Sequence, residues 1–155
     1  MTQTIAGRLQ SMGVTLPKPA TPVASYVGFV RQGDLVYVSG QLPFVGGKLT
    51  KTGLLGQDVT VEEGAEEARI CAINLLAQVN KACEGDLERV VRCVRLGGFV
   101  ASTPAFADHP KVINGASDFV GAVFGEKGAH ARAAVGVAAL PLNACVEVEG
   151  LFAVR

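Results

Sequence analysis

Residues 130–149, which read HARAAVGVAALPLNACVEVE, are the most informative segment of this chain. Side chains alternate in character along both halves of this stretch, and a turn-like segment at residues 140–143 separates the halves. This pattern predicts two strands joined into a hairpin. Because successive side chains of a strand point to opposite faces, one face of the hairpin can cover helices and form core. We assign to this core face Ala133, Val135, Val137, Ala139, Val146, Val148 and Phe152.

The opposite face of the predicted hairpin carries charged side chains among small ones. If the turn leaves Ala139 opposite Ala144, then Arg132 and Glu147 share this face. They would lie about four strand residues apart, roughly 13 Å between their α-carbons at 3.3 Å per residue. Both side chains could then reach toward one small bound anion. The alternative is that both are ordinary charges of the surface or of a subunit interface. The other residues on this face are Ala134, Gly136, Ala138, Cys145 and Glu149.

The composition indicates one soluble domain that associates with other subunits. Of the 155 residues, 49% are hydrophobic and only 18% are charged, below the usual quarter. Further subunits are therefore expected to cover part of the apolar surface. Fourteen basic residues balance fourteen acidic ones, which argues against nucleic acid or a membrane as a partner. The N-terminus lacks an apolar signal core, and no run reaches membrane-spanning length, so we expect a cytoplasmic protein.

The four cysteines are interpreted as free, buried thiols of a protein in a reducing compartment. They form no CxxC pair, and neither histidine lies at ligand spacing from them. This argues against a zinc site and against disulfides, and we expect no metal. The cysteines are Cys71, Cys83, Cys93 and Cys145.

The rest of the chain predicts the element order β-β-α-β-α-β-β behind an N-terminal appendage of residues 1–20. The appendage combines a short helix at residues 4–12 with a proline-containing connector, and residues 21–155 form the domain. Two long helices on one face of a mainly antiparallel sheet make the predicted fold class α+β. The remaining expected elements are strands at residues 26–31, 35–39 and 90–100, a helix from the capping box Thr60–Glu63 to Gly85, and a helix from Asp108 to Gly125.

Several short segments, taken in order along the chain, resemble the RidA/YjgF family of reactive-intermediate deaminases, once labelled endoribonuclease L-PSP. The resemblance implies a chorismate-mutase-like fold and a homotrimer with clefts between its subunits. Active members hydrolyse small 2-enamine and 2-imino acids to 2-keto acids and ammonia, and the resemblance implies no cofactor. The matching segments are SGQLP at residues 39–43, the helix after residues 57–58, Asn114, AR at residues 131–132, VAALP at residues 137–141 and VEVE at residues 146–149.

The resemblance also implies a set of site residues. The arginine matching Arg132 holds the substrate carboxylate, and the glutamate matching Glu147 orients the attacking water. These roles suit the chemistry, because a guanidinium binds a carboxylate through two hydrogen bonds and a carboxylate can direct the proton of a water molecule. The substrate is intrinsically reactive, so positioning can suffice without a cofactor. The other residues implied to line the site are Tyr26, Ser39, Gly40 and Asn114.

Each of these residues also has an ordinary structural interpretation. Tyr26 can pack as a strand aromatic residue, Ser39 can belong to a turn at a strand end, and Asn114 can bond the backbone near a helix start. The two histidines, His109 and His130, are interpreted as surface residues of a helix start and of a loop end.

The chain departs from the family pattern at Ala134, where many active relatives carry threonine, serine or cysteine. A missing hydroxyl or thiol contact leaves an alternative function open, a non-catalytic trimer that binds or senses small carboxylic or 2-keto acids. The longer stretch up to about Ala20 suggests a divergent subgroup. Ribonuclease action is disfavoured, because the charge is balanced and neither a stacking platform nor an acid–base histidine pair is evident.

Overall fold

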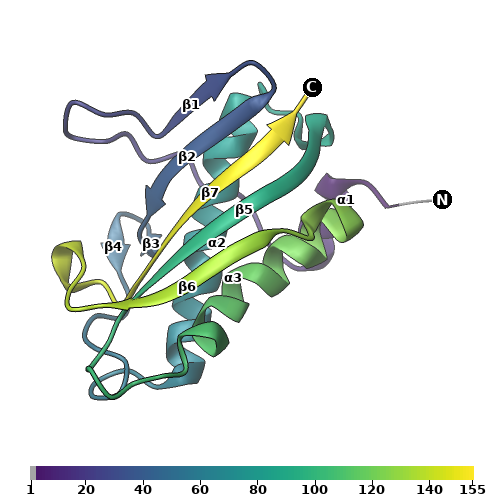
Figure 1. Cartoon of the computed structure of the whole chain (residues 1–155). Helices are drawn as coiled ribbons and strands as arrows, with labels where there is room; N and C mark the ends of the chain where they lie inside the picture. Colours follow the sequence, from purple (N-terminus) through teal and green to yellow (C-terminus); the bar gives the residue numbers. More distant parts are fainter. Residues whose placement is uncertain (1–2) are drawn as a thin grey trace.

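The structure, a computed structural model that describes residues 3–155, is an α+β fold built on one five-stranded sheet (Figure 1). The strands of this sheet lie in the order β1-β2-β7-β5-β6, and a separate small hairpin pairs β3 with β4. The strands are β1 Phe29–Gln32, β2 Leu35–Gln41, β3 Phe44–Val45, β4 Lys48–Leu49, β5 Val90–Ala101, β6 Ala131–Val137 and β7 Val146–Val154. The helices are α1 Ile5–Ser11, α2 Val61–Ala82 and α3 His109–Phe124, with short 3-10 turns η1 Leu87–Arg89, η2 Gly125–Gly128 and η3 Pro141–Asn143.

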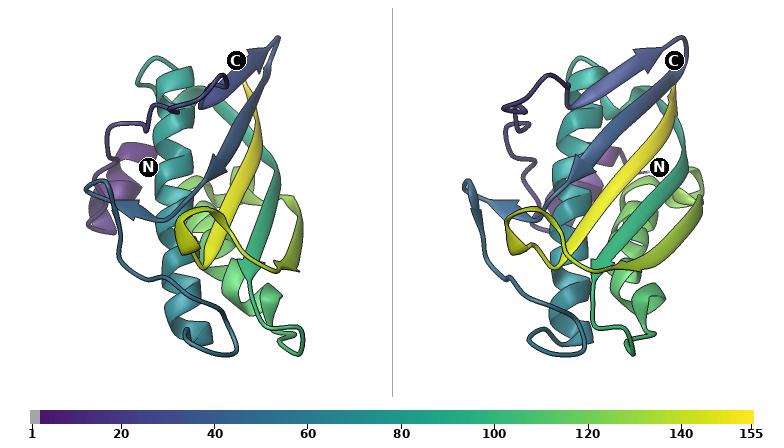
Figure 2. Two further views of the ribbon diagram at one scale, coloured as in Figure 1. Left: turned by 90° about the vertical axis from the view of Figure 1, so that its left-hand side faces the viewer. Right: turned by 60° about the vertical axis from the view of Figure 1, so that its left-hand side comes forward.

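The two long helices cover a single face of the sheet, as the sequence predicted. Helix α2 packs against β2 and β7, and α3 packs against β5 and β6. Figure 2 shows the sheet with both helices on the same side, and no helix of residues 3–155 lies over the other side. We call this uncovered side the open face. No helix in this part of the chain is both long and apolar enough to cross a membrane.

The predicted hairpin of residues 130–149 is wrong. Strand β6 does not pair with β7, because β5 lies between them and pairs with both. The pairing of β5 with β6 is parallel, and α3 forms the connection between these two strands. A parallel pair needs such a crossover, and a helix of this length supplies it. After β6 the chain crosses to β7 through η3, where Leu142 and Asn143 adopt positive φ.

This topology puts Arg132 and Glu147 on opposite faces of the sheet, so their predicted shared face is also wrong. Arg132 pairs with Leu96, which is fully buried under the helices. Glu147 pairs with Phe99, whose other neighbour is Val135. Val135 is 45% exposed on the open face. Side chains of paired residues point the same way, so Arg132 points toward α3 and Glu147 points away from it.

The core face predicted for residues 130–149 is correct for β7 and wrong for β6. In β7 the predicted core residues Val146, Val148 and Phe152 are fully buried. In β6 the facing is reversed, because Ala134 packs against the core while Val135 lies on the open face.

Helix α2 forms as its sequence predicts. The Thr60 hydroxyl accepts a hydrogen bond from the Glu63 backbone amide at 3.1 Å, and the Glu63 carboxylate accepts one from the Thr60 amide at 2.9 Å. This capping box satisfies amides that have no partner within the helix. The helix then buries an apolar stripe and ends near Gly85, whose φ of +89° suits glycine. The buried stripe includes Ala68, Ala72, Leu75, Leu76 and Val79.

Helix α3 starts after Asp108 as expected, although the Asp108 side chain makes no capping hydrogen bond and pairs instead with Lys111 at 3.3 Å. The helix crosses α2 at very short range. A Cβ atom placed on Gly115 would overlap the backbone oxygen of Ala65 in α2. Glycine at position 115 is therefore what allows the two helices to approach this closely.

The N-terminal helix α1 lies where the sequence predicted a short helix, and it packs onto the same core as the rest of the chain. Its residues Ile5 and Leu9 are buried, and the Arg8 guanidinium donates to the Val123 carbonyl at 3.2 Å. The domain boundary near residue 20 stays a prediction.

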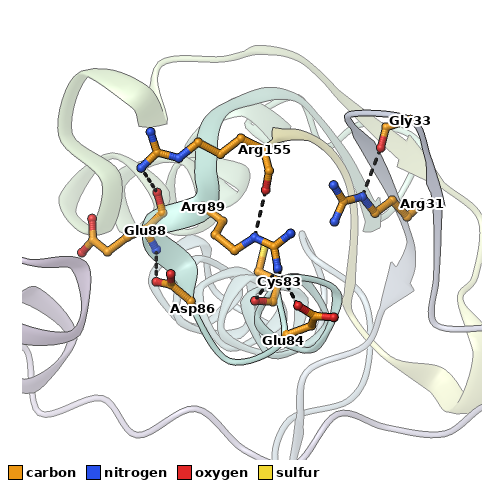
Figure 3. Close-up of polar contacts among 8 residues, drawn as sticks. All are labelled: Arg31, Gly33, Cys83, Glu84, Asp86, Glu88, Arg89 and Arg155. Atoms are coloured by element: carbon orange, nitrogen blue, oxygen red, sulfur yellow. Dashed lines mark hydrogen bonds and ion pairs between the residues drawn. The ribbon is translucent and has the colours of Figure 1, made fainter.

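A network of arginines ties the start of β5 to the end of β7 (Figure 3). The Arg89 side chain donates to the Arg155 carbonyl at 2.9 Å and to the Glu84 carboxylate at 2.8 Å. The Arg155 side chain donates in turn to the Glu88 carbonyl at 3.4 Å. These contacts join the two central strands to the turn that follows α2.

Candidate functional site

Arg132 lies in the edge strand β6 and extends toward α3. Its Nη1 donates to the Ser117 hydroxyl at 3.1 Å, and its Nη2 donates to the Pro110 carbonyl at 3.3 Å. Within residues 3–155, no carboxylate forms an ion pair with this guanidinium. Because a guanidinium carries five N–H donors, these two contacts leave donors for a ligand.

A surface groove of about 450 Å³ adjoins the Arg132 side chain. Asn114 and Ser117 line it from α3, three residues apart and therefore on one side of the helix. The structure thus brings together two of the predicted site residues, Asn114 and Arg132. The other lining residues are Gly121, Gly125, Gly128, Ala129 and His130.

Ser117 and His130 form a hydrogen-bonded pair beside Arg132 that the sequence interpretation missed. The Ser117 hydroxyl lies 2.9 Å from His130 Nε2, and His130 Nδ1 lies 2.6 Å from the Gly128 carbonyl oxygen. His130 is therefore not a free surface histidine at a loop end. One signal was present in the sequence, because Ser117 lies one helical turn after Asn114 and so faces the same side.

Glu147 lies on the open face, beside an irregularity in β2. The pairing of β2 with β7 shifts register between Val38 and Gln41, which marks a bulge at Ser39 and Gly40. A Cβ atom on Gly40 would overlap the Glu147 carboxylate, so the carboxylate sits directly against the backbone of Gly40. Burial raises the pKa of the half-buried Glu147 carboxyl, and the neighbouring carboxylate of Glu149 raises it further.

Ser39 lies on the open face next to Gly40, whereas Tyr26 lies in a groove against α2. The Ser39 hydroxyl donates to the Val27 carbonyl at 2.6 Å, so its proton is used to hold the loop before β1. Tyr26 is not in a strand; it precedes β1, is 59% exposed and lines a groove with Gln78 and Lys81 of α2. The structure therefore joins Ser39, Gly40 and Glu147 in one place and keeps Arg132 and Asn114 in another.

The open face around Glu147 carries several exposed apolar side chains. Val30 and Tyr37 are 52% and 51% exposed on it, in addition to Val135. A hollow of about 380 Å³ on this face is lined by Tyr37, Ser39 and the ion pair of Arg95 with Glu149, which are 3.4 Å apart. This face resembles a surface that another protein chain covers.

Gly136 of β6 lies directly against two polar side chains of neighbouring elements. A Cβ atom at this position would lie 2.5 Å from His109 Nε2 and 2.8 Å from the Ser102 hydroxyl. These two side chains are hydrogen-bonded to each other at 3.1 Å. Gly136 therefore leaves room for a pair of the protein's own side chains.

The thiols take no part in either group of candidate site residues. All four cysteines are free and buried, as predicted. Burial raises the pKa of Cys93 and of Cys145 to about 12, so both stay protonated at neutral pH. Among residues 3–155, no group of three or more histidine, cysteine or acidic side chains could hold a metal ion.

The comparisons with known proteins agree with this fold. A family model described as YjgF/chorismate mutase-like, putative endoribonuclease, matches residues 6–154. The chain belongs to this family. Its membership confirms the resemblance predicted from the sequence and the chorismate-mutase-like fold.

Individual relatives extend the match over nearly the whole chain. Protein TCP17 of Trypanosoma cruzi is 49% identical over 150 residues, which cover 95% of this chain and 92% of the relative. The crystal structure of Atu1372, a protein of unknown function from Agrobacterium tumefaciens, is 50% identical and has a TM-score of 0.92, covering 97% of this chain and 92% of its own. RidA from the Antarctic bacterium Psychrobacter sp. PAMC 21119 is 26% identical with a TM-score of 0.60, covering 88% of this chain and 94% of its own.

Proposed function

We propose that the protein hydrolyses small reactive 2-enamine and 2-imino acids to 2-keto acids and ammonia, at sites formed between copies of this chain. One observation carries the proposal. Arg132 borders a groove with N–H donors left over, while Glu147 lies on the other face of the same sheet. Within one chain the sheet separates the cation from the carboxylate.

A site that uses both residues therefore needs a second copy of the chain. If the open face of one copy meets the β6–α3 edge of another, Glu147 of the first copy approaches Arg132 of the second. The exposed apolar side chains of the open face, Val30, Tyr37 and Val135, support such an association. A closed ring of three copies would repeat this contact three times and leave no open face, so we propose a homotrimer.

The proposed chemistry uses simple positioning. The Arg132 guanidinium binds the substrate carboxylate, which orients the adjacent C=N carbon. Glu147 accepts a proton from a water molecule as the water oxygen bonds to that carbon, and passes this proton to the imine nitrogen to give a carbinolamine. Glu147 then moves the hydroxyl proton of the carbinolamine to the same nitrogen, so the C–N bond breaks, ammonia leaves as the C=O bond forms, and Glu147 is ionised again. The raised pKa of Glu147 makes it a stronger base than an exposed glutamate, which suits this role.

The test supplies 2-imino acids generated in situ by an amino acid oxidase and follows the release of 2-keto acid and ammonia. The protein is expected to accelerate release over the spontaneous rate. Arg132→Ala should abolish the acceleration, and Glu147→Gln should reduce it at least about 100-fold, the usual contribution of a general base. Lys48→Ala, an exposed cation of β4, is the matched control and should react as the parent protein does. Release at the spontaneous rate with every imino acid tried would refute the proposal.

A second candidate function is favoured by one observation, the alanine at position 134. Ala134 packs against the core and presents neither a hydroxyl nor a thiol beside Arg132. On this alternative the trimer binds small carboxylic or 2-keto acids without turnover. Thermal stabilisation by such acids that depends on Arg132, together with no release of ammonia, would favour this binder over the enzyme.

A further inference from the structure

We propose that Ser117 and His130 complete the carboxylate site of Arg132, and that His130 takes up one proton when the carboxylate binds. The inference rests on the proposed function, because it assumes that Arg132 holds a small carboxylate. It adds two residues and a coupled proton that neither the family nor the sequence pattern assigned.

The directions of the hydrogen bonds around Ser117 follow from what each group can donate. The Gly128 carbonyl only accepts, so His130 Nδ1 carries a hydrogen and donates to it at 2.6 Å. The Arg132 guanidinium only donates, so the Ser117 oxygen accepts from Nη1 at 3.1 Å. The Ser117 hydroxyl is then left to donate to His130 Nε2 at 2.9 Å. This arrangement is consistent only with a neutral imidazole.

A second proton on His130 reverses the central hydrogen bond. Nε2 becomes a donor, so the Ser117 oxygen faces two donors, Nε2 and Arg132 Nη1, and its own hydrogen must find another acceptor. A carboxylate bound at Arg132 is such an acceptor, because it accepts at both oxygens and donates at neither. The protonated state therefore offers the anion one more donor, and binding and protonation favour each other.

The imidazole is held in place by the packing behind it. A Cβ atom on Gly128 would lie 2.6 Å from the Val120 carbonyl oxygen of α3, so only glycine lets η2 approach the helix this closely. This approach fixes the Gly128 carbonyl that anchors Nδ1. With Nδ1 anchored in this way, Nε2 is the imidazole nitrogen that faces Ser117.

Other charged groups belong to the elements around His130. Asp118 follows Ser117 on α3, and Glu126 and Lys127 lie on η2. Lys127 donates to the Val90 carbonyl at 3.3 Å, and Arg8 of α1 reaches the α3–η2 junction at the Val123 carbonyl. The remaining charged groups lie at the start of α3, away from Ser117. They are Asp108, His109 and Lys111. None of these groups is hydrogen-bonded to Ser117 within residues 3–155; among charged side chains of that range, Arg132 forms such a bond.

The experiment measures the binding of pyruvate by calorimetry at about pH 5.5 and pH 8. Pyruvate stays ionised throughout this range, so any pH dependence comes from the protein. We expect the parent protein to bind pyruvate about tenfold more weakly at the higher pH. This factor is the lower end of the change in affinity expected when one hydrogen bond to a charged group is lost. Repeating the titration near neutral pH in two buffers of different ionisation enthalpy should show proton uptake on binding.

Three variants separate the contributions of Ser117 and His130 to the pH dependence of pyruvate binding. Ser117→Ala and His130→Gln should still bind pyruvate but lose most of the pH dependence, and His130→Gln should also lose the proton uptake. Ser117→Thr keeps the hydroxyl and should retain both. Thermal unfolding of each variant verifies that it is folded at both pH values.

The outcomes distinguish the two proposals. If the parent protein binds pyruvate through Arg132 but Ser117→Ala and His130→Gln keep its full pH dependence, the coupled site is refuted and the proposed function stands. A parent affinity that does not change with pH also refutes the coupled site, because protonation of His130 then gives the bound anion no additional donor. If the parent protein binds no carboxylate, or Arg132→Ala binds as well as the parent, the proposed function fails and the inference fails with it.

Discussion

Two glycines of helix α3 should respond in opposite ways to the same substitution. At Gly121, no described atom beyond the adjoining residues and backbone of its own helix lies within 4 Å of the position that a Cβ would occupy. Gly121→Ala therefore adds a methyl group without a clash and removes backbone freedom from the unfolded chain. We expect it to raise the free energy of unfolding by about 0.5–1 kcal/mol.

At Gly115 the same methyl group would overlap the Ala65 backbone oxygen of α2. A backbone atom within a helix cannot swing aside as a side chain can, so α2 and α3 must separate. Overpacking of this kind costs about 1–3 kcal/mol, and the steric overlap with backbone places this case at the upper end. After subtraction of the gain in helix propensity, Gly115→Ala should lower the free energy of unfolding by about 2 kcal/mol.

Urea unfolding followed by circular dichroism measures both effects, with the protein concentration held constant because association adds to apparent stability. In thermal scans, Gly115→Ala should lower Tm by about 4–8 °C, and Gly121→Ala should raise it by about 1–4 °C. The comparison is internal to one helix, so general effects of alanine cancel. If Gly115→Ala stabilises the protein as much as Gly121→Ala does, the close crossing of α2 and α3 is wrong.

Three further predictions concern Gly40, Glu67 and the thiols. Gly40→Ala should displace the Glu147 carboxylate and lower kcat at least about tenfold, with pyruvate affinity little changed; equal kcat in steady-state assays would argue against a role for Glu147. Glu67 is 5% exposed, its Oε1 accepts from Thr50 at 3.0 Å, and its Oε2 has no partner within residues 3–155. Burial raises the pKa of Glu67 in the folded state, so the stability contributed by its neutral form is present below the unfolded pKa and is lost as pH rises through the folded pKa. The free energy of unfolding of Glu67→Gln, relative to that of the parent, should therefore increase by on the order of 1 kcal/mol as the pH rises from about 4.5 to about 7.5. Urea unfolding at each pH measures this difference, and a difference that does not change with pH would contradict the prediction. Since burial holds the pKa of Cys93 and Cys145 at about 12, neither thiol should react with a disulfide reagent at about pH 8 until urea unfolds the chain.

The local elements and the family were predictable from the order of the amino acids. The capping box of Thr60 and Glu63 depends on residues three apart, so it is visible before any tertiary contact forms. The burial of Val146, Val148 and Phe152 follows from the alternation of side chains within one strand. The ordered family segments were sufficient for the fold class, which the match over residues 6–154 confirms.

The neighbours of each strand in the sheet, in contrast, depend on long-range packing. Strands β6 and β7 are close in the sequence, yet β5 separates them in the sheet. A hairpin and a parallel crossover use the same alternating pattern, and the choice depends on contacts with β5, whose residues precede their partners in β6 by 36 positions. The strand–helix–strand order from β5 through α3 to β6 was the one sequence signal for the crossover.

The same choice of neighbours decided the site. Because β5 intervenes, the facing of β6 reverses, so Arg132 meets Ser117 and His130 under α3 while Glu147 stays on the open face. Hydrogen bonds between residues thirteen and fifteen positions apart leave no periodic trace in a sequence. The sequence therefore predicts an arginine suited to a carboxylate. Which side chains surround that arginine depends on how α3 packs against the edge strand β6.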